Sequence, residues 1–417
     1  MFYDKTVLDS GVTVLTEHMD GVRSAALGFW VRIGARDEAP HEYGMSHFME
    51  HMLFKGTPTR SALDISTAFD ELGADFNAFT SREYTCFYTR LIDERLACGF
   101  EILADMIVNA SFTHDTIVPE RKVVLEEIAR NQDTPEDYVY DVFADCMHPT
   151  NTLGRPILGT KETVSAFETE QMRAYHDAHY TSGNIYVVAC GNVDHAQIVA
   201  LAQEHLANII RGERLSRKPC EEEQRVELRA VKRDSEQAHI LYGMPSISAE
   251  SEQRHAYGLL DIMLGGGMSS RLFQEIREKR GLVYSVYTST QLYEGSGVFY
   301  MYAGTRPDNI GKVLEVAQAE FAKTVQEGLT QKELDRAKEL ACGNFVLGME
   351  STRTHMTRLG RLITTGRPLI SIDETLEKYR AVTLEEVNEA AKVLYDRKPT
   401  IAIVSPYEQE EIERMLS

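Results

Sequence analysis

The chain has 417 residues, more than a single compact core usually holds, so two or more domains are expected. Its apolar content of 43% and charged content of 26% are typical of globular proteins and exclude a disordered or fibrous chain. The 64 acidic and 44 basic side chains leave a net charge of −20, which argues against nucleic-acid binding because phosphate recognition needs a basic face.

The sequence gives no sign of a secretory or membrane segment. The first residues, MFYDKTVLDSGVTVL, contain neither a basic start nor a long apolar run, and no stretch of about 18 apolar residues occurs. Six cysteines are scattered without a CxxC pair, which favours a reducing compartment over a disulfide framework. We therefore expect a cytoplasmic protein with neither a membrane nor a nucleic acid as partner.

Strands and helices alternate along the first half. Residues 25–33, AALGFWVRI, form an apolar run expected in a strand, and residues 62–73 have a helical period that should end at Gly73. Residues 74–92 alternate apolar and polar around a turn-like TSRE, which predicts a β-hairpin, and residues 95–110 should form a long helix. Because no βαβ nucleotide fingerprint occurs, we predict an α+β fold with helices covering sheets.

The stretch HFMEHMLFKGT, residues 47–57, is the first candidate site. His47 and His51 are four residues apart, so on a helix both imidazoles share a face and can bind one cation. Glu50 leans to the same side. The three residues form the HExxH metalloprotease motif in reverse order, and in that motif the glutamate serves as general base. The alternative is an incidental histidine pair. A catalytic zinc site also needs a third protein ligand from another element.

Residues 118–137 are predicted to form a helix that supplies this ligand. Glu120 and Glu127 are seven residues apart, which is about two helical turns, so both carboxylates lie on one face. One can bind the metal while the other supports a ligand through a hydrogen bond. A solvated acidic helix is the alternative.

The ends of the two halves of the chain share a pattern. Residues 168–193 and 383–408 each begin with an acidic helix start, reach a tyrosine, turn, and continue into an apolar strand. Tyr180 and Tyr395 correspond at an offset of 215 residues, about half the chain, which predicts two homologous domains.

The predicted domains are each a mostly antiparallel sheet covered by helices. The charge-rich, weakly periodic segment between them is taken as the linker. The predicted boundaries are 1–209 for the N-terminal domain, 210–226 for the linker and 227–417 for the C-terminal domain.

The HxxEH motif, followed 76 residues after His51 by Glu127, resembles the inverted-zincin family that contains pitrilysin, insulin-degrading enzyme and the mitochondrial processing peptidase. The likeness extends over most of the chain and is strongest to the bacterial two-domain processing-peptidase-like branch. It implies a peptidase in which His47, His51 and Glu127 bind zinc, Glu50 is the general base and Glu120 assists catalysis.

A second segment of the first half carries the resemblance. NAFTSREYT, residues 77–85, is similar to the family strand whose exposed edge receives the substrate. This implies that Asn77, Ala78 and Phe79 lie beside an extended peptide, held by β-augmentation. An ordinary edge hairpin is the alternative.

In the second half, residues 265–286 resemble the family's glycine-rich segment with its Arg/Tyr motif. The spacing of seven residues selects Arg277 and Tyr284, whose implied role is to bind the substrate backbone. The GGG run lacks a GK[ST] ending, which disfavours nucleotide binding. Because this half has no HxxEH, one Zn²⁺ per chain is expected.

These observations together predict a zinc-dependent endopeptidase that cleaves short or unfolded peptides. Two alternatives of other classes remain. One is a catalytically weak or inactive assembly subunit of the same fold, since the respiratory-complex core proteins resemble this family. The other is a peptide-binding protein that keeps its zinc but rarely cleaves, which only an assay separates from the enzyme.

The resemblance also implies an assembly. Longer relatives join four such domains in one chain, so a homodimer of this chain would rebuild the four-domain chamber, with Arg277 and Tyr284 facing the partner's zinc. The net charge of −20 favours basic peptides if acidic side chains line that chamber, and otherwise only keeps the protein soluble. Salt should then lower kcat/KM for an Arg-rich peptide more than for a neutral one.

Overall fold

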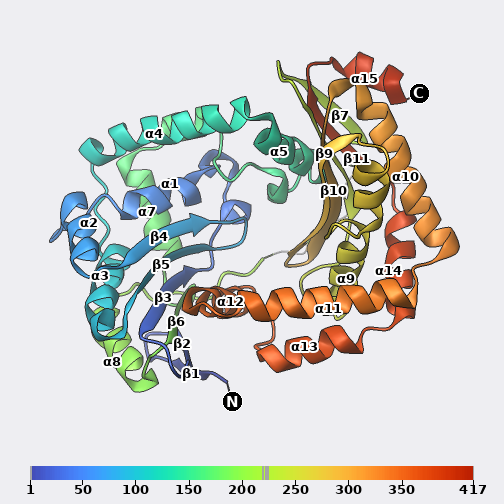
Figure 1. Cartoon of the computed structure of the whole chain (residues 1–417). Coiled ribbons are helices and arrows are strands. Elements are labelled where there is room, and N and C mark those ends of the chain that lie inside the picture. Colours follow the sequence, from blue (N-terminus) through green and yellow to red (C-terminus); the bar gives the residue numbers. More distant parts are fainter. Residues whose placement is uncertain (1, 218–219, 221–224, 417) are drawn as a thin grey trace. The chain divides into compact units, whose positions relative to one another are not determined.

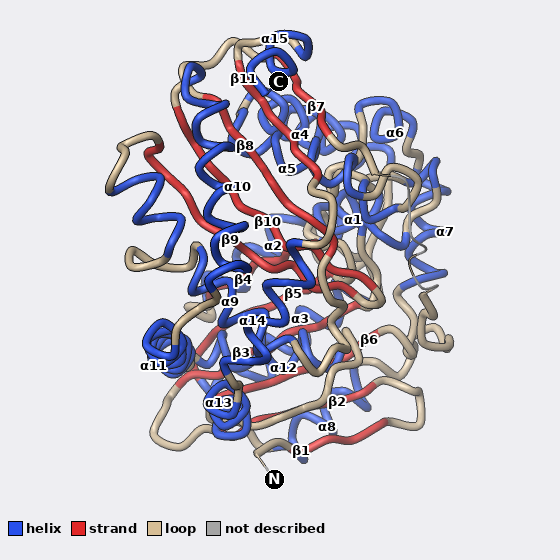
Figure 2. The backbone as a smooth tube through the Cα atoms, turned by 90° about the vertical axis from the view of Figure 1, so that its right-hand side faces the viewer, coloured by secondary structure: helices blue, strands red, loops and turns tan. Residues whose placement is uncertain are grey.

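The computed structural model describes residues 2–217, 220 and 225–416, which form two compact units, each built on one β-sheet (Figures 1 and 2). The first unit comprises Met1–Ile128, Arg155–Arg217 and Gly348–Leu369, and the second comprises Ala129–Gly154, Lys218–Leu347 and Ile370–Ser417. The α+β class predicted from the sequence is confirmed.

The first unit contains a six-stranded sheet in the order β1-β2-β6-β3-β5-β4. Neighbouring strands are antiparallel except for β2 and β6, which are parallel, so the predicted, mostly antiparallel sheet is confirmed. The predicted strand at 25–33 and hairpin at 74–92 are also confirmed. The strands are β1 (Asp4–Val7), β2 (Thr13–His18), β3 (Ser24–Val31), β4 (Asp75–Thr80), β5 (Thr85–Ile92) and β6 (Ile185–Gly191).

Helices of the first unit bury their apolar sides against one face of this sheet, where Phe29, Phe87 and Phe100 lie in the core. Gly73 has a φ of 60° directly after α2, so the predicted helix end is confirmed. The bounds 118–137 predicted for the next helix were wrong at both ends. Helix α4 begins at His114 and ends at Asp133, and a new helix begins at Pro135. The helices are α1 (Met45–Leu53), α2 (Ala62–Glu71), α3 (Leu96–Val108), α4 (His114–Asp133), α6 (Lys161–Ala166), α7 (Thr169–His179) and α8 (His195–His205).

The second unit contains a five-stranded sheet in the order β7-β11-β8-β10-β9, with one parallel pair, β7 and β11. The order α14–β11–α15 repeats α7–β6–α8 of the first unit, as the similar sequences at 168–193 and 383–408 predicted. The strands are β7 (Leu228–Lys232), β8 (Ala238–Pro245), β9 (Val283–Tyr293), β10 (Ser296–Thr305) and β11 (Thr400–Ser405). The helices are α9 (Arg254–Leu264), α10 (Ile310–Glu327), α11 (Gln331–Gly348), α13 (Ile372–Ala381), α14 (Leu384–Tyr395) and α15 (Gln409–Leu416).

Two helices are exchanged between the halves of the chain. Helix α12 (Thr352–Thr364) packs on the first sheet, where Met356 and Leu359 contact a buried cluster around Trp30 (Figure 1). Helix α5 (Pro135–Met147) packs on the second sheet, where Phe143 meets Tyr300 edge to face. Each sheet therefore has two apolar faces, and the second face is covered by a helix from the other half.

This exchange is where the compact units differ from the predicted domains at 1–209 and 227–417. Residues 129–154 join the second unit and residues 348–369 join the first. The predicted linker 210–226 is part of the first unit up to Arg217, while its residues 218–219 and 221–224 lie outside the described residues.

All six cysteines are free thiols. Within the described residues, no helix combines the length and apolar character needed to cross a membrane.

The exchange of α12 gives a stability prediction. Gly360 of α12 packs so closely on Trp30 that a Cβ atom would overlap the indole ring. Gly360→Ala should therefore lower the free energy of unfolding by about 1–3 kcal/mol, although alanine favours an isolated helix. The matched control is Gly343→Ala in α11, where a Cβ meets no atom within 4 Å and should be neutral or stabilise by up to about 1 kcal/mol. Equal effects in denaturant unfolding would contradict this packing account.

Candidate metal centre

Helix α1 carries the two histidines, and a buried carboxylate fixes where it begins. Glu38, which is 2% exposed, accepts hydrogen bonds from the backbone N–H groups of Gly44 at 2.8 Å and Ser46 at 2.7 Å. These N–H groups have no partner inside the helix, so the carboxyl oxygens of Glu38 supply their acceptors. Burial raises the pKa of Glu38 to about 8, against the lowering effect of these hydrogen bonds. Gly44 has a φ of 93°, which favours glycine, and a Cβ there would strike Leu158.

The helical period then separates the two sides of α1. Phe48, Met49, Met52 and Leu53 are buried in the core of the first unit. His47, Glu50 and His51 take the positions between them, so their side chains leave the core on a common side. The two imidazole rings lie 4.7 Å apart between centroids.

Helix α4 brings the two predicted carboxylates to the histidines. Val124 and Ile128 bury one side of α4, and Glu120, which is 6% exposed, lies on the same side. Glu127 follows two turns later with its side chain 40% exposed. Both glutamates therefore meet α1, as the spacing of seven residues predicted.

The side-chain atoms of His47, His51 and Glu127 converge within 4.8 Å of one another. Oε2 of Glu127 lies 3.6 Å from Nε2 of His47 and 3.5 Å from Nε2 of His51. Ligand atoms on a tetrahedral zinc ion, each about 2.0–2.2 Å from the metal, are roughly 3.3–3.6 Å apart. These two distances therefore fit neighbouring ligands of one zinc ion.

Unsatisfied polar atoms support this fit. Oε2 of Glu127 is buried and has no hydrogen-bond partner among the described residues. A buried carboxylate oxygen without a donor is costly, so a cation between it and the two imidazoles would account for its position. Within residues 2–217, 220 and 225–416, this is the one cluster of three or more His, Cys, Asp or Glu residues with such spacing.

Glu120 takes a different role from Glu127. Its Oε1 accepts a hydrogen bond of 2.7 Å from Nδ1 of His51, and its Oε2 lies 2.5 Å from Nζ of Lys55. This bond places the proton of His51 on Nδ1 and leaves Nε2 free to face Glu127. The sequence spacing left open which glutamate lies with the histidine Nε2 atoms. In the structure, Glu127 is among the three converging groups, and Glu120 hydrogen-bonds the Nδ1 atom of His51.

The pKa shifts follow the same arrangement. Burial, with a smaller contribution from the charge of His51, lowers the pKa of His47 to about 3, so this imidazole is neutral and able to bind a cation. Burial also opposes a charge on His51, but the hydrogen bond with Glu120 and the charges of the surrounding carboxylates raise its pKa overall. Burial alone would raise the pKa of Glu120, but the hydrogen bonds and charges of His51 and Lys55 outweigh burial and lower that pKa overall.

Glu50 lies beside the cluster but is not part of it. Its Oε2 accepts a hydrogen bond of 2.5 Å from the hydroxyl of Thr80, the last residue of β4. Burial raises the pKa of Glu50, and the bond from Thr80 opposes that rise. The structure thus connects the candidate base directly to the strand predicted to bind substrate.

Strand β4 lies at the edge of its sheet. It pairs with β5 on one side, and no strand among the described residues pairs with its other side. Asn77 is exposed, Ala78 packs against the core, and the Phe79 ring meets Trp30 at 5.7 Å on the opposite face. The three predicted residues therefore share a backbone edge, although their side chains alternate between the two faces.

Arg277 and Tyr284 are brought together in the second unit. Arg277 belongs to a π-helical segment, Phe273–Glu278, and its guanidinium lies 5.7 Å from the ring centre of Tyr284 in β9. Tyr284 is 78% exposed, which is unusual for an aromatic side chain and fits a contact surface. A role in substrate binding stays a prediction.

Sequence reasoning missed Glu38, Lys55 and Thr80. Lys55 follows His51 by four residues, and a basic side chain one turn after a candidate ligand was a usable signal. Thr80 was part of the quoted strand, but only the pairing of β4 with β5 shows that its side chain turns to the same side as α1. The two bonds that Glu38 accepts at the start of α1 depend on a loop that no periodic pattern predicts.

Two family models match most of the chain between them. The model described as "Insulinase (Peptidase family M16)" matches residues 13–161, and the one described as "Peptidase M16 inactive domain" matches residues 166–340. Proteins named "Uncharacterized zinc protease" are similar over nearly the full length. The one from Streptomyces coelicolor is 40% identical, covering 99% of this chain and 91% of the relative, and the one from Bacillus subtilis is 36% identical, covering 95% and 97%.

Solved structures share the fold at lower sequence identity. A crystal structure from Pseudomonas fluorescens described as a "peptidase M16 inactive domain" has a TM-score of 0.91, with 21% identity and 98% of each chain covered. The crystal structure of a protease from Helicobacter pylori has a TM-score of 0.89, with 19% identity, covering 97% of this chain and 99% of that one.

The geometry predicts a difference between two glutamates of α4. Glu120→Gln should weaken Zn²⁺ binding by about 10–100-fold, because the acceptor that orients His51 becomes neutral. Glu126→Gln is the matched control, since Glu126 is exposed on the same helix and should leave affinity unchanged. Competition with a coloured chelator measures both. Equal affinities for the two variants would contradict the role given to Glu120.

Proposed function

The chain belongs to the insulinase (M16) family of peptidases, and from that premise we propose that it is a zinc-dependent endopeptidase that cleaves short or unfolded peptides. The observation that carries the proposal is the convergence of His47, His51 and Glu127, with Glu50 held at their side by Thr80. This arrangement joins a candidate metal site, a candidate base and a free strand edge within one unit.

Each side chain has a defined part in the proposed reaction. His47, His51 and Glu127 would hold the zinc, and Glu120 would keep the His51 ring in its binding orientation. When bound, Zn²⁺ supplies Lewis-acid chemistry, polarising the scissile carbonyl group and making water more acidic. Glu50 would remove the proton of the attacking water and return it to the leaving amine.

The reaction needs an extended substrate. Peptide N–H and C=O groups can continue the sheet at the open side of β4, so that backbone bonds hold the chain whatever its side chains are. A folded protein seldom offers such a free strand, and we therefore propose short or unfolded peptides as substrates. Whether basic peptides are preferred is the question that the salt dependence of kcat/KM answers.

The alternative is a catalytically weak or inactive peptide-binding or assembly subunit of the same fold. The words "inactive domain" describe the family model that matches residues 166–340. That segment excludes His47, His51 and Glu127, so the description fits a half of the chain that lacks the motif. The presence of the three converging groups favours the enzyme over an assembly subunit that has lost its metal ligands, whereas an assay separates the enzyme from a peptide-binding protein that keeps its zinc.

Glu50→Gln tests the proposal. The variant should bind Zn²⁺ as wild type does, because Glu50 is not one of the three converging groups, but kcat should fall by about 10²-fold or more through loss of the base. Cleavage of a quenched peptide library, with metal content measured on the same samples, gives both results. Glu126→Gln controls for removing one negative charge. Unchanged kcat, or loss of zinc from Glu50→Gln, would overturn the assignment.

We also propose that the active form is a homodimer in which Arg277 and Tyr284 of one chain serve the zinc site of the other. Each chain has one set of converging groups, His47, His51 and Glu127, in its first unit. It has one Arg277–Tyr284 pair, in its second unit. The longer relatives described above suggest that four such domains complete one chamber. The localisation that we propose is cytoplasmic.

Complementation tests the dimer. Glu50→Gln and Arg277→Ala chains should each be nearly inactive, yet random mixing should restore about a quarter of wild-type activity, because half of the dimers are mixed and each carries one intact site. Subunit exchange is verified with tagged chains. An active monomer, or no recovery despite exchange, would refute the proposal.

A further inference from the structure

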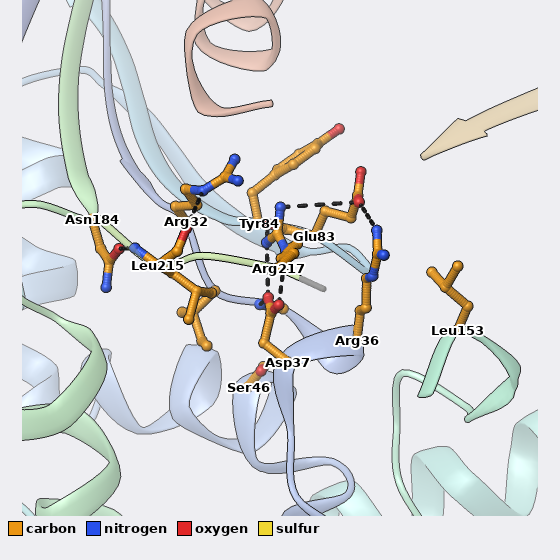
Figure 3. A network of polar contacts seen from close by, with 12 residues as sticks. Arg32, Arg36, Asp37, Ser46, Glu83, Tyr84, Leu153, Asn184, Leu215 and Arg217 are labelled. Carbon is orange, nitrogen blue, oxygen red and sulfur yellow. Dashed lines mark hydrogen bonds and ion pairs between the residues drawn. The ribbon is translucent and has the colours of Figure 1, made fainter. Parts of the chain in front are cut away.

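A buried network that includes four charged side chains lies outside the candidate metal centre and reaches the predicted linker at Arg217 (Figure 3). We call Arg36, Asp37, Glu83 and Arg217 the latch. Their side chains are between 3% and 5% exposed. Arg217 binds Asp37 through two bonds of 2.8 Å each, and Arg36 binds Glu83 at 2.6 Å. Arg217 also donates to the backbone carbonyl of Glu83.

The latch joins three segments that are distant in sequence. Asp37 belongs to the loop that enters α1, Glu83 lies in the turn between β4 and β5, and Arg217 is the last residue of the first unit before the unit boundary. Backbone bonds already pair the loop with the turn, from Ala35 N–H to Ser81 O at 3.2 Å and from Arg36 N–H to Arg82 O at 2.8 Å.

The backbone around Arg217 is itself anchored. Leu215 donates its N–H to the side chain of Asn184 at 2.7 Å and accepts a bond of 3.1 Å from Arg32 (Figure 3). The guanidinium of Arg217 therefore reaches Asp37 from a backbone segment without regular secondary structure that is anchored two residues earlier, at Leu215. Such anchoring lowers the entropy lost when a long side chain is held in one place.

The latch lies next to the segment that opens α1 and next to the end of β4 along the chain. Asp37 precedes Glu38, whose carboxylate holds the first N–H groups of α1, the helix of Glu50. Glu83 follows Thr80 by three residues in the turn that closes β4. The latch therefore joins a residue directly before Glu38, which caps α1, to a turn that directly follows β4, the strand that bonds to Glu50.

Energetic reasoning argues against stability as the sole role. Buried ion pairs cost desolvation, and well-packed apolar residues often replace them without loss of stability, so such networks are weak evidence of a stabilising purpose. What they supply is fixed geometry, especially where an arginine binds a carboxylate with two bonds. A fixed geometry is what the short bond between Thr80 and Glu50 requires.

We propose that Arg217 of the linker is a positioning residue of the peptidase centre, fixing the β4–β5 turn against the loop that enters α1 so that Thr80 meets Glu50. This inference rests on the proposed function for its catalytic readout. It assigns the linker a role in the site of the first unit, beyond that of a covalent connection.

The test compares Arg217→Met with a matched arginine of the second unit. Arg271 binds Glu333 through two bonds of 2.7 and 3.0 Å and donates to the carbonyl of Gly328 at 2.9 Å, the same pattern as Arg217. Arg271→Met should therefore lose comparable interactions without touching the latch. Arg217→Lys keeps the charge but not the two-bond geometry, and should recover part of the lost function.

Three measurements are made on each variant, all well below its melting temperature. For Arg217→Met, kcat should fall about 10-fold or more, since small displacements of reacting groups are costly, whereas Arg271→Met should stay within about 2-fold of wild type. Amide hydrogen exchange at Ala35 and Arg36 should accelerate in Arg217→Met, less so in Arg217→Lys, and not in Arg271→Met. Zinc content should be unchanged in all variants.

The outcomes separate this inference from the proposed function. A wild-type protein without peptidase activity would refute the enzyme, while exchange at Ala35 and Arg36 would still decide whether Arg217 holds the loop to the turn. Unchanged kcat and exchange in Arg217→Met, or equal losses of kcat in Arg217→Met and Arg271→Met, would overturn the positioning role. If Arg217→Met does not fold, Asp37→Asn weakens the same bonds with little change of shape and gives the same readouts.

Discussion

The convergence of three side-chain atoms within 4.8 Å constrains both helices of the candidate metal centre. Neither α1 nor α4 can shift by a turn without separating Glu127 from His47 and His51, because one turn moves a side chain by about 5.4 Å. The surroundings are built to prevent such a shift. Glu38 sets the start of α1, Glu120 fixes the ring of His51, and the apolar sides of both helices are buried in one core.

The exchanged helices cover the second apolar face of each sheet. α5 and α12 begin 217 residues apart, close to the offset of 215 that relates the two halves, so they occupy equivalent places in the repeat. Each covers the apolar face of the sheet made by the other half. Trp30 of β3 packs against α12 with no exposed surface, and it also contacts Phe79 of the edge strand β4. The far half of the chain therefore supports the strand that lies beside the site.

Much of the site could be predicted because its signals are local. The spacing of His47 and His51 is a property of one helix, and the hairpin at 74–92 follows from alternation within one segment. The repeat of helix, tyrosine and strand was visible because both copies keep their order. Gly73 as a helix end was equally local, since only the backbone angle of one residue is involved.

What could not be predicted depends on contacts between distant segments. Spacing alone left Glu120 and Glu127 equivalent, and only the position of α4 beside α1 gives one to His51 Nδ1 and the other to the two Nε2 atoms. The exchange of α5 and α12 left no trace in periodicity, because an amphipathic helix does not specify which sheet it covers. Arg217 lies in a charge-rich segment, so the sequence does not distinguish it from its charged neighbours. Its ion pair with Asp37 depends on the fold.

The most direct measurement of the central claim is anomalous diffraction at the zinc edge from crystals of the zinc-loaded protein. The account predicts one strong peak per chain, about 2.0–2.2 Å from Nε2 of His47, Nε2 of His51 and a carboxylate oxygen of Glu127. A peak at cysteine sulfur or at other histidines, with no density between α1 and α4, would contradict it.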